Sequence, residues 1–389
     1  MQQTALTGLT IWDGQTRADA DCITITGPQI TGICTSDDLP PGVRRISCDG
    51  ATAIPGLMDA HVHMELNPEH REPPKQTDLG QRPQMLERAA AMVRAGITTA
   101  RDLGGGAWLE LELRDRINAG EVPGPRLLCA GQPITSPQGH CHFWGGEAAD
   151  IDAANAVLAR QVEHGVDLIK VMATGGRMTR GSTPLEPQFD LATLTAIVAS
   201  AQSHQLQVAA HCHGTAGIEL AAQAGVKTIE HCSWVGPQGW ASDFQPQVAE
   251  LILDQGAWVS PTVNRGWQRM LDNKDQSLVQ RLRAAYQGMW NLGIPFVAST
   301  DAGIPGVFHH HLPEALHVFA KIADLTPEQA LQTATSGAAR ALGIESLSGR
   351  LSTGLSADIL VLDGDPLTDL TALTRPVAVW ARGVPVVMP

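Results

Sequence analysis

Short apolar runs alternate with amphipathic segments through the middle of the chain. The amphipathic segments, such as QMLERAAAMVRAG, IDAANAVLARQVEHG and LATLTAIVASAQSH, repeat apolar residues at helical spacing, and two of them end at Gly, a common helix stop. The apolar runs read as strands, and we count eight, each followed by a helical segment: AIPGLMDAH, GITTARDLG, PRLLCAGQPI, VDLIKVMATGG, QVAAHCH, VKTIEHCS, AWVSPTV and IPFVASTDAG.

This regular order predicts an α/β fold, a (β/α)8 barrel of the TIM type over residues 55–347. A doubly wound open sheet is the alternative. Such a sheet would normally carry a Gly-rich nucleotide loop after its first strand, and the loop after His63 is not one. We expect the helical segment TPEQALQTATSGAARALGI to pack beside the barrel.

Both ends of the chain are rich in strand signals. LTGLTIWDG and ADCITITGPQITGIC alternate apolar and polar residues, and ADILVLDGDPL and PVAVWARGVPVVM are β-branched runs bounded by Asp-Gly, Pro and Gly. We therefore expect residues 1–54 and 348–389 to form one composite β-sandwich domain.

Composition narrows the class of protein. Of the 389 residues, 43% are hydrophobic and 17% charged, which is typical of a soluble globular enzyme. The net charge of −13 and the lack of a basic stripe argue against a nucleic-acid partner. No apolar run approaches the roughly 18 residues that span a bilayer. We expect a small-molecule substrate and no membrane partner, and the oligomeric state, including a homo-oligomer, stays open.

The seven cysteines favour a reducing compartment. Their number is odd and no C-x-x-C pair occurs, so free thiols are expected rather than a disulfide framework. The N-terminal MQQTALTGLTIWDGQ lacks a charged region followed by an apolar core. These features predict a cytoplasmic protein.

Polar side chains mark the ends of several predicted strands. Residues i and i+2 of a strand point the same way, so His61 and His63 should project side by side, and two imidazoles can begin a transition-metal site. Because a (β/α)8 barrel carries its active site at the carboxyl ends of its strands, the groups at five strand ends should converge. They are His61 and His63, Lys170, His211 and His213, His231, and Asp301.

Each of these residues also has an ordinary structural interpretation. Lys170 could extend its amine to solvent, but it sits among apolar neighbours, and a desolvated lysine loses its proton readily and can form an anionic carbamate with carbon dioxide. Asp301 could cap a helix, and His231 could be a hydrogen-bonded core residue. His211 and His213 compete for one ligand position, because both would point inward.

The set His61-x-His63, Lys170, His211, His231 and Asp301 resembles, in chain order and strand placement, that of the amidohydrolase superfamily. The segments DLIKVMATGG, AAHCHGTAGI, TIEHCS and ASTDAG are similar to the branch of imidazolonepropionase-like enzymes and metallo-dipeptidases, often called Xaa-Pro dipeptidases or prolidases. The resemblance covers essentially the whole chain, since GLSADILVLDGDPL looks like the family's composite β-sandwich.

This resemblance implies two divalent ions, usually zinc. His61, His63 and Asp301 would bind the more buried ion and His211 and His231 the other, with carboxylated Lys170 and a hydroxide between them. Asp301 would take the proton of the attacking hydroxide and pass it to the leaving amine. His213 stands where related dipeptidases often have a tyrosine proposed to bind substrate, a departure that bears on dipeptide specificity.

Loops after the strands supply candidate substrate-binding residues. Arg177 suits a carboxylate, although it could equally be a solvated loop arginine. His140 and His142 in GHCHFWGG could bond a carbonyl or carboxylate, although a structural role in the loop is open for both. His309 opens the tract His309–His311, which we interpret as rim or lid.

Together these residues predict a binuclear hydrolase of amide bonds, in dipeptides or N-acyl amino acids. The same centre could attack a cyclic amide, a lactone or a carbamate, because a fold does not fix its substrate. A catalytically silent scaffold is the alternative from another class, although no metal ligand is missing.

Overall fold

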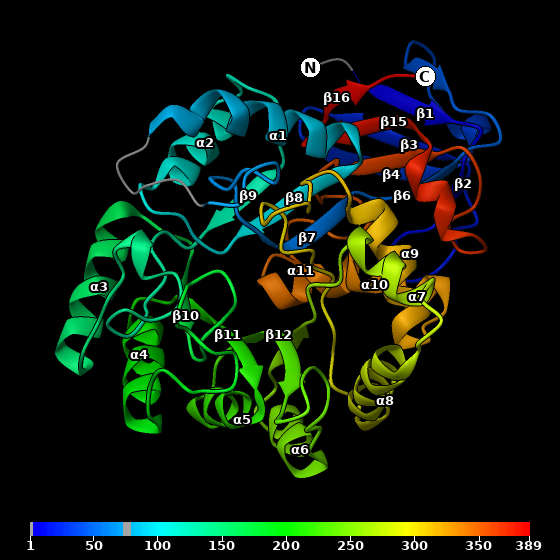
Figure 1. The fold of residues 1–389 in the computed structure, drawn as a ribbon. Coiled ribbons are helices and arrows are strands. Elements are labelled where there is room, and N and C mark those ends of the chain that lie inside the picture. Colours follow the sequence, from blue (N-terminus) through cyan, green and yellow to red (C-terminus); the bar gives the residue numbers. More distant parts are fainter. Residues whose placement is uncertain (1–2, 73–78) are drawn as a thin grey trace.

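Parallel strands line a barrel in the middle of the computed structural model, which describes residues 3–72 and 79–389 (Figure 1). They form two runs of neighbouring strands that are all paired in parallel. The first run holds β7 (Leu57–Val62), β8 (Ile97–Asp102) and β9 (Arg126–Cys129). The second holds β10 (Leu168–Met172), β11 (Gln207–Gly214), β12 (Thr228–Val235) and β13 (Trp258–Ser260).

Residues 295–302 close the barrel between β13 and β7. On one side the amide of Val297 donates to the carbonyl of Val259, and on the other the amide of Ala60 donates to the carbonyl of Ala298. The amide of Asp301 then donates to the carbonyl of His61. This segment is the predicted eighth strand, but it bonds to its neighbours through isolated bridges and not as a regular strand. The predicted (β/α)8 barrel is confirmed.

Helices follow the strands and surround the barrel (Figure 1). Their ends agree with local sequence signals: the side chain of Asp150 caps α3, and Gly165 ends that helix with a left-handed φ of 74°. In chain order they are α1 (Arg82–Arg94), α2 (Leu109–Asn118), α3 (Ile151–His164), α4 (Leu191–Ser203), α5 (Thr215–Ala224), α6 (Pro246–Asp254), α8 (Ser277–Leu292) and α9 (Leu312–Ala323).

The helical segment that follows α9 is divided. It forms α10 (Pro327–Thr333) and α11 (Ser336–Leu342), where the sequence pattern indicated one segment. The carbonyls of Thr333 and Ala334 accept hydrogen bonds from the barrel amides of Ala298 and Met58. These carbonyls are directed at the strands, so the helix is interrupted where it touches the barrel.

Strands from both ends of the chain build the second, smaller domain. One sheet has the order β4-β3-β1-β5, with β1 (Thr4–Thr7), β3 (Cys22–Thr26), β4 (Gln29–Cys34) and β5 (Arg44–Ser47). The other has the order β16-β15-β14-β6-β2 and joins β2 (Thr10–Ile11) and β6 (Thr52–Pro55) to β14 (Ile359–Leu362), β15 (Pro376–Ala381) and β16 (Val384–Val387).

β14, in the middle of this second sheet, is buried on both faces. Ile359 and Val361 pack into the sandwich core, whereas the alternate residues Leu360 and Leu362 belong to the core shared with the barrel. The composite β-sandwich is confirmed, and its boundaries at residues 54 and 348 stay a prediction. All seven cysteines are free. Within the described ranges no helix combines the length and hydropathy needed to cross a bilayer.

Candidate metal centre

A cavity of about 190 Å3 lies at the carboxyl ends of the barrel strands. The structure brings every predicted metal ligand to its lining: His61, His63, Lys170, His211, His231 and Asp301. His140, Arg177 and His213 line it as well. The convergence expected from the barrel topology is therefore present.

One group of potential ligands consists of His61, His63 and Asp301. The Nε2 atoms of His61 and His63 lie 3.3 and 3.4 Å from the same oxygen, Oδ1 of Asp301. The two histidines come from β7 and the loop after it, and Asp301 follows the closing segment of the barrel. Two imidazole nitrogens and one carboxylate oxygen facing one point can hold a divalent ion.

Both imidazoles of this group are held by their other nitrogen. Nδ1 of His61 is 2.9 Å from a carboxylate oxygen of Glu230, and Nδ1 of His63 is 2.8 Å from the carbonyl oxygen of Gly104. Each acceptor fixes the tautomer in which Nδ1 carries the proton and Nε2 presents its lone pair to the cavity.

Glu230 is fully buried and remains charged because of a second partner. Arg101 donates to it from Nη2 at 2.7 Å, and Thr228 donates its hydroxyl. Burial alone would raise the pKa of Glu230, but Arg101 and His61 outweigh it and hold that pKa well below its usual range. A full negative charge therefore lies behind His61.

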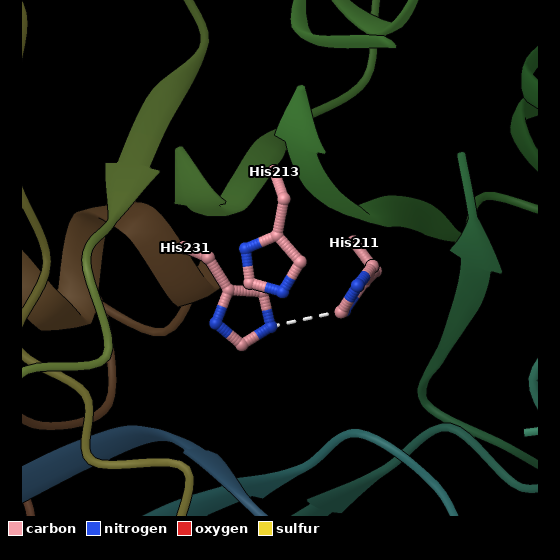
Figure 2. Close-up of side chains that lie close together, drawn as sticks. All are labelled: His211, His213 and His231. Carbon is pink, nitrogen blue, oxygen red and sulfur yellow. Dashed lines mark hydrogen bonds between the residues drawn. The ribbon is translucent and has the colours of Figure 1, made fainter. Parts of the chain in front are cut away.

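The second group of potential ligands is made of three histidines, His211 and His213 on β11 and His231 on β12 (Figure 2). Their ligand atoms all lie within 4.8 Å of one another. Nε2 of His231 is 3.0 Å from Nδ1 of His211. The two groups adjoin, because the ring centres of His61 and His231 are 5.1 Å apart.

Neutral groups orient the second set of imidazoles. Nε2 of His211 lies 3.2 Å from the carbonyl of Gly175, and Nδ1 of His231 lies 2.8 Å from the hydroxyl of Thr262. Nδ1 of His213 is 2.9 Å from the hydroxyl of Ser233. Each ring is thereby fixed through one nitrogen. The other nitrogens of His211 and His231 face each other at 3.0 Å, and the other nitrogen of His213 lies within 4.8 Å of them.

Left-handed backbone conformations, which are uncommon outside glycine, occur at several residues that line the cavity, including Cys141 with a φ of 58°. The φ angles of three others are 64° for His231, 51° for Thr262 and 61° for Asp301. Such conformations cost free energy and cluster at functional sites. At His231 the turn allows neighbouring side chains to serve the same site, because Glu230 bonds His61 while His231 faces His211.

Lys170, on β10, is 1% exposed and lines the cavity. No carboxylate of the described residues lies within salt-bridge distance of its amine. Burial, the largest influence, lowers the pKa of Lys170 from its usual value. The uncharged amine is the form that reacts with carbon dioxide.

The donor set fits divalent transition metals. Burial lowers the pKa of His61 to about 4 and that of His213 to about 3, and it holds the pKa values of His211 and His231 well below normal. These four imidazoles are therefore neutral near pH 7, the state in which they ligate metals. The pKa of Asp301 lies far below its usual range, because the nearby histidines outweigh burial.

Comparison with known proteins agrees with this geometry. The model of the amidohydrolase family matches residues 52–386. The chain belongs to the amidohydrolase family. As such it is a metal-dependent enzyme that acts on C–N bonds.

Individual relatives of this amidohydrolase are distant. Ochratoxinase of Aspergillus niger is 27% identical over 374 residues, which cover 85% of this chain and 74% of the relative. A crystal structure of a Xaa-Pro dipeptidase with bound methionine has a TM-score of 0.85 and 24% identity, covering 99% of each chain. A prolidase complexed with N-methylphosphonate-L-proline has the same TM-score and identity, covering 100% of each chain. These two structures show the likeness of the fold.

Of the five predicted substrate-binding residues of the amidohydrolase, some line the cavity and others do not. His140, Arg177 and His213 line the cavity. His142 does not, and its Nδ1 lies 3.0 Å from the carbonyl of its own loop residue Gly139. His309 also lies outside the lining, and its Nε2 donates to the carbonyl of His63 at 3.0 Å.

Several residues at the site carried no clear signal in the sequence. Glu230 was the most accessible to prediction, because an acidic residue inside an apolar strand such as TIEH needs a buried partner. Thr262 follows a short strand, and its role depends on a left-handed turn. The indoles of Trp144, Trp240 and Trp267 give the cavity its apolar walls.

Proposed function

We propose that this amidohydrolase is a binuclear enzyme that hydrolyses the amide bond of dipeptides or N-acyl amino acids. The observation that carries the proposal is the meeting of the two ligand groups in one cavity that also contains Lys170 and is lined by the arginine Arg177. The ligand groups supply the hydrolytic chemistry, and the arginine suits a carboxylate beside the scissile bond.

In this proposal His61, His63 and Asp301 hold one ion, His211 and His231 hold the other, and carboxylated Lys170 contributes a ligand to both. Zinc suits this set of nitrogen and oxygen donors. When bound, two such cations lower the pKa of a water molecule and polarise the scissile carbonyl. His213 is left to contact the substrate.

Asp301 is suited to move the proton. Its side chain is 15% exposed, toward the cavity, and its low pKa keeps it ionised and able to accept a proton. The carboxyl group then delivers that proton to the nitrogen of the leaving amine. His61 and His63 fix the position of Oδ1 during this transfer.

His140 is suited to hold the substrate carbonyl. It is 4% exposed and its Nδ1 has no hydrogen-bond partner among the described residues. An unpaired buried polar atom is costly, and a substrate oxygen would supply a partner for it. Burial lowers the pKa of His140 to about 4, so the ring contributes a neutral N–H.

Arg177 is suited to bind the substrate carboxylate. Its guanidinium carbon lies 5.5 Å from the ring centre of Trp240, and that indole meets the ring of His213 edge-on at 4.8 Å. The cation–π contact orients the guanidinium without using its hydrogen-bond donors. The donors remain for a carboxylate. The structural likeness to a Xaa-Pro dipeptidase and to a prolidase supports this class of substrate.

The test is a screen of the metal-loaded protein against dipeptides and N-acyl amino acids, each paired with its carboxamide analogue. We expect amide hydrolysis of the acids, and a fall in kcat/KM of about 10–100-fold for the carboxamides, as expected for losing a charge-assisted bond. Arg177→Gln should erase this preference. Exclusive hydrolysis of lactones, or equal rates on acids and carboxamides, contradicts the proposal.

The carboxylation of Lys170 has a separate test. Protein equilibrated with 13C-bicarbonate should show one carbamate carbon signal, because burial lowers the pKa of the amine and so favours its uncharged, reactive form. Lys170→Met should lack the signal, whereas Lys227→Met, which removes another lysine, should retain it. A wild-type spectrum without the signal argues against a carboxylated lysine.

A further inference from the structure

A second cavity, of about 600 Å3, lies beside the metal centre and plays no part in the function proposed above. One wall follows β13 and includes the 3-10 helix η4 (Arg265–Trp267) and α7 (Gln268–Leu271). The loop after the barrel-closing segment and the start of α9 form another wall, and the 3-10 helix η5 (Leu370–Thr374) forms the third. Figure 1 shows α7 beside α9.

The two cavities share part of their lining. Asn264 is 8% exposed and lines both of them. The next residues of the chain divide between them, because Arg265 lines the second cavity and Trp267 lines the catalytic one. The second cavity also reaches Thr300, the residue before Asp301. It is therefore adjacent to the catalytic cavity.

The charge of this cavity is opposite to that of the protein. Arg265 and Arg269 line it against a single carboxylate, Glu314, whereas the whole chain carries −13. Nη1 of Arg265 is 3.9 Å from Glu314 and 3.1 Å from Nε2 of His311. Arg269 bonds only the carbonyl of Gly266, at 3.4 Å, and has no carboxylate partner among the described residues. One guanidinium is therefore uncompensated.

Apolar side chains form the rest of the lining. They come from the second and third walls, and they are Val307, Phe308, Pro313, Val318 and Leu370. A free inorganic anion would use the arginines and leave these side chains against water. A ligand with an apolar body and one negative end would pair its charge with the arginines and bury its body against the apolar side chains.

We propose that the cavity bounded by Arg265, Arg269, Phe308 and Leu370 is a second ligand site that binds a small carboxylate with an apolar body. The carboxylate pairs with Arg269 and Arg265, and the body packs against Phe308, Val318 and Leu370. The site is distinct from the metal centre and does not depend on the proposed amide hydrolysis.

The test measures binding of 3-phenylpropionate to the metal-loaded protein by calorimetry and by ligand-observed NMR. Two analogues separate the parts of the ligand: 3-phenylpropanamide lacks the charge and acetate lacks the apolar body. We expect each analogue to bind at least about 10-fold more weakly, in line with the loss of a charged hydrogen bond or of a buried ring.

Variants place the binding event in the molecule. Arg269→Gln should weaken 3-phenylpropionate by about 10-fold or more, and the charge-preserving Arg269→Lys should retain most of the affinity. Arg44→Gln, which removes an exposed arginine of β5, is the matched control and should bind as the wild type does. Arg269 is exposed and makes one weak side-chain bond, so its replacement should leave folding intact.

Arg177→Gln distinguishes this site from the catalytic cavity. The proposal requires that this variant keep its affinity for 3-phenylpropionate. Loss of binding in Arg177→Gln, unchanged binding in Arg269→Gln, equal binding of the analogues, or no binding to the wild type would each overturn it. Amide hydrolysis is measured separately, so failure of the second site and failure of the proposed function are distinguishable.

Discussion

The two ligand groups of the metal centre differ in charge although they adjoin in one cavity. His61 and His63 share the carboxylate of Asp301 and are backed by Glu230, whereas His211, His213 and His231 are backed by a carbonyl and two hydroxyls. In the first group the carboxylate of Asp301 can neutralise a cation directly, and the charge of Glu230 acts on it through the ring of His61. The second offers only neutral nitrogen. We call the group of His61, His63 and Asp301 the anionic half of the centre and the group of His211, His213 and His231 the neutral half. We expect the anionic half to hold its ion more tightly.

The largest effect on turnover should come from removing the negative charge of Asp301 in the anionic half. Asp301→Asn should lower kcat by about 10²–10⁴-fold while the protein still binds metal, because the proton carrier is lost but the histidines remain. Steady-state kinetics with metal analysis by mass spectrometry measures both. Asp324→Asn is the matched control, since Asp324 also has a left-handed backbone, with φ of 56°. Near-normal turnover of Asp301→Asn would remove it from the proton transfer.

The second test compares the groups behind the imidazoles. Glu230→Gln should weaken binding of the ion held by His61 by about 10–100-fold, and Thr262→Val should weaken the ion held by His231 by less. Competition with a chromogenic chelator measures both affinities. Because Glu230→Gln leaves Arg101 buried without a counter-charge, the free energy of unfolding should also fall by about 3–5 kcal/mol. Equal effects of the two variants on metal affinity would contradict the difference between the halves.

Variants of His213 and His211 test which histidines of the neutral half bind metal. If His213 contacts substrate, His213→Ala should raise KM by about 10-fold and leave two ions bound, whereas His211→Ala should lose one ion. Kinetics and metal analysis on the same samples separate these outcomes. His204→Ala, at an exposed histidine, should change neither. Loss of an ion from His213→Ala would assign His213 to the metal.

The smallest expected effect is that of pH on the metal content of the protein. A lowered pKa means that an imidazole stays neutral below pH 6.5, and the pKa of His213 is about 3 while those of His211 and His231 lie well below normal. Protons should therefore not compete for the neutral half between about pH 8 and pH 5. Metal content after desalting at each pH should stay constant over this range. Release with a midpoint near 6.5 would show imidazoles that titrate as exposed ones do.

The sequence was sufficient to predict the barrel and the convergence of the candidate metal ligands in one place. Alternation along β7 predicts that His61 and His63 point the same way, and the βα order predicts that Lys170, His211, His231 and Asp301 meet them; the structure has both features. These predictions rest on local periodicity and on one rule of topology, so no long-range contact had to be known.

The groups behind the ligands could not be predicted in the same way. Strict alternation places Glu230 opposite to His231, but the left-handed backbone at His231, with φ of 64°, breaks the alternation and both residues serve the site. The acceptor for His63 is a backbone carbonyl, that of Gly104, which has no sequence signature. His142 and His309 were placed from loop position alone, and the loop conformation directs them to backbone carbonyls.

The pairing of β6 with β14 bears on the order of events during synthesis. Residues 52–55 of β6 lead directly into β7 and are paired along their length with residues 359–362. Because a chain emerges from its N-terminus, β6, which precedes the strand that carries His61, waits for a partner made near the end of translation. The histidines of β11 and β12 have no such dependence. The three histidines of the neutral half are thus synthesised before Asp301 and before β14, so the anionic half of the centre is the last to be completed.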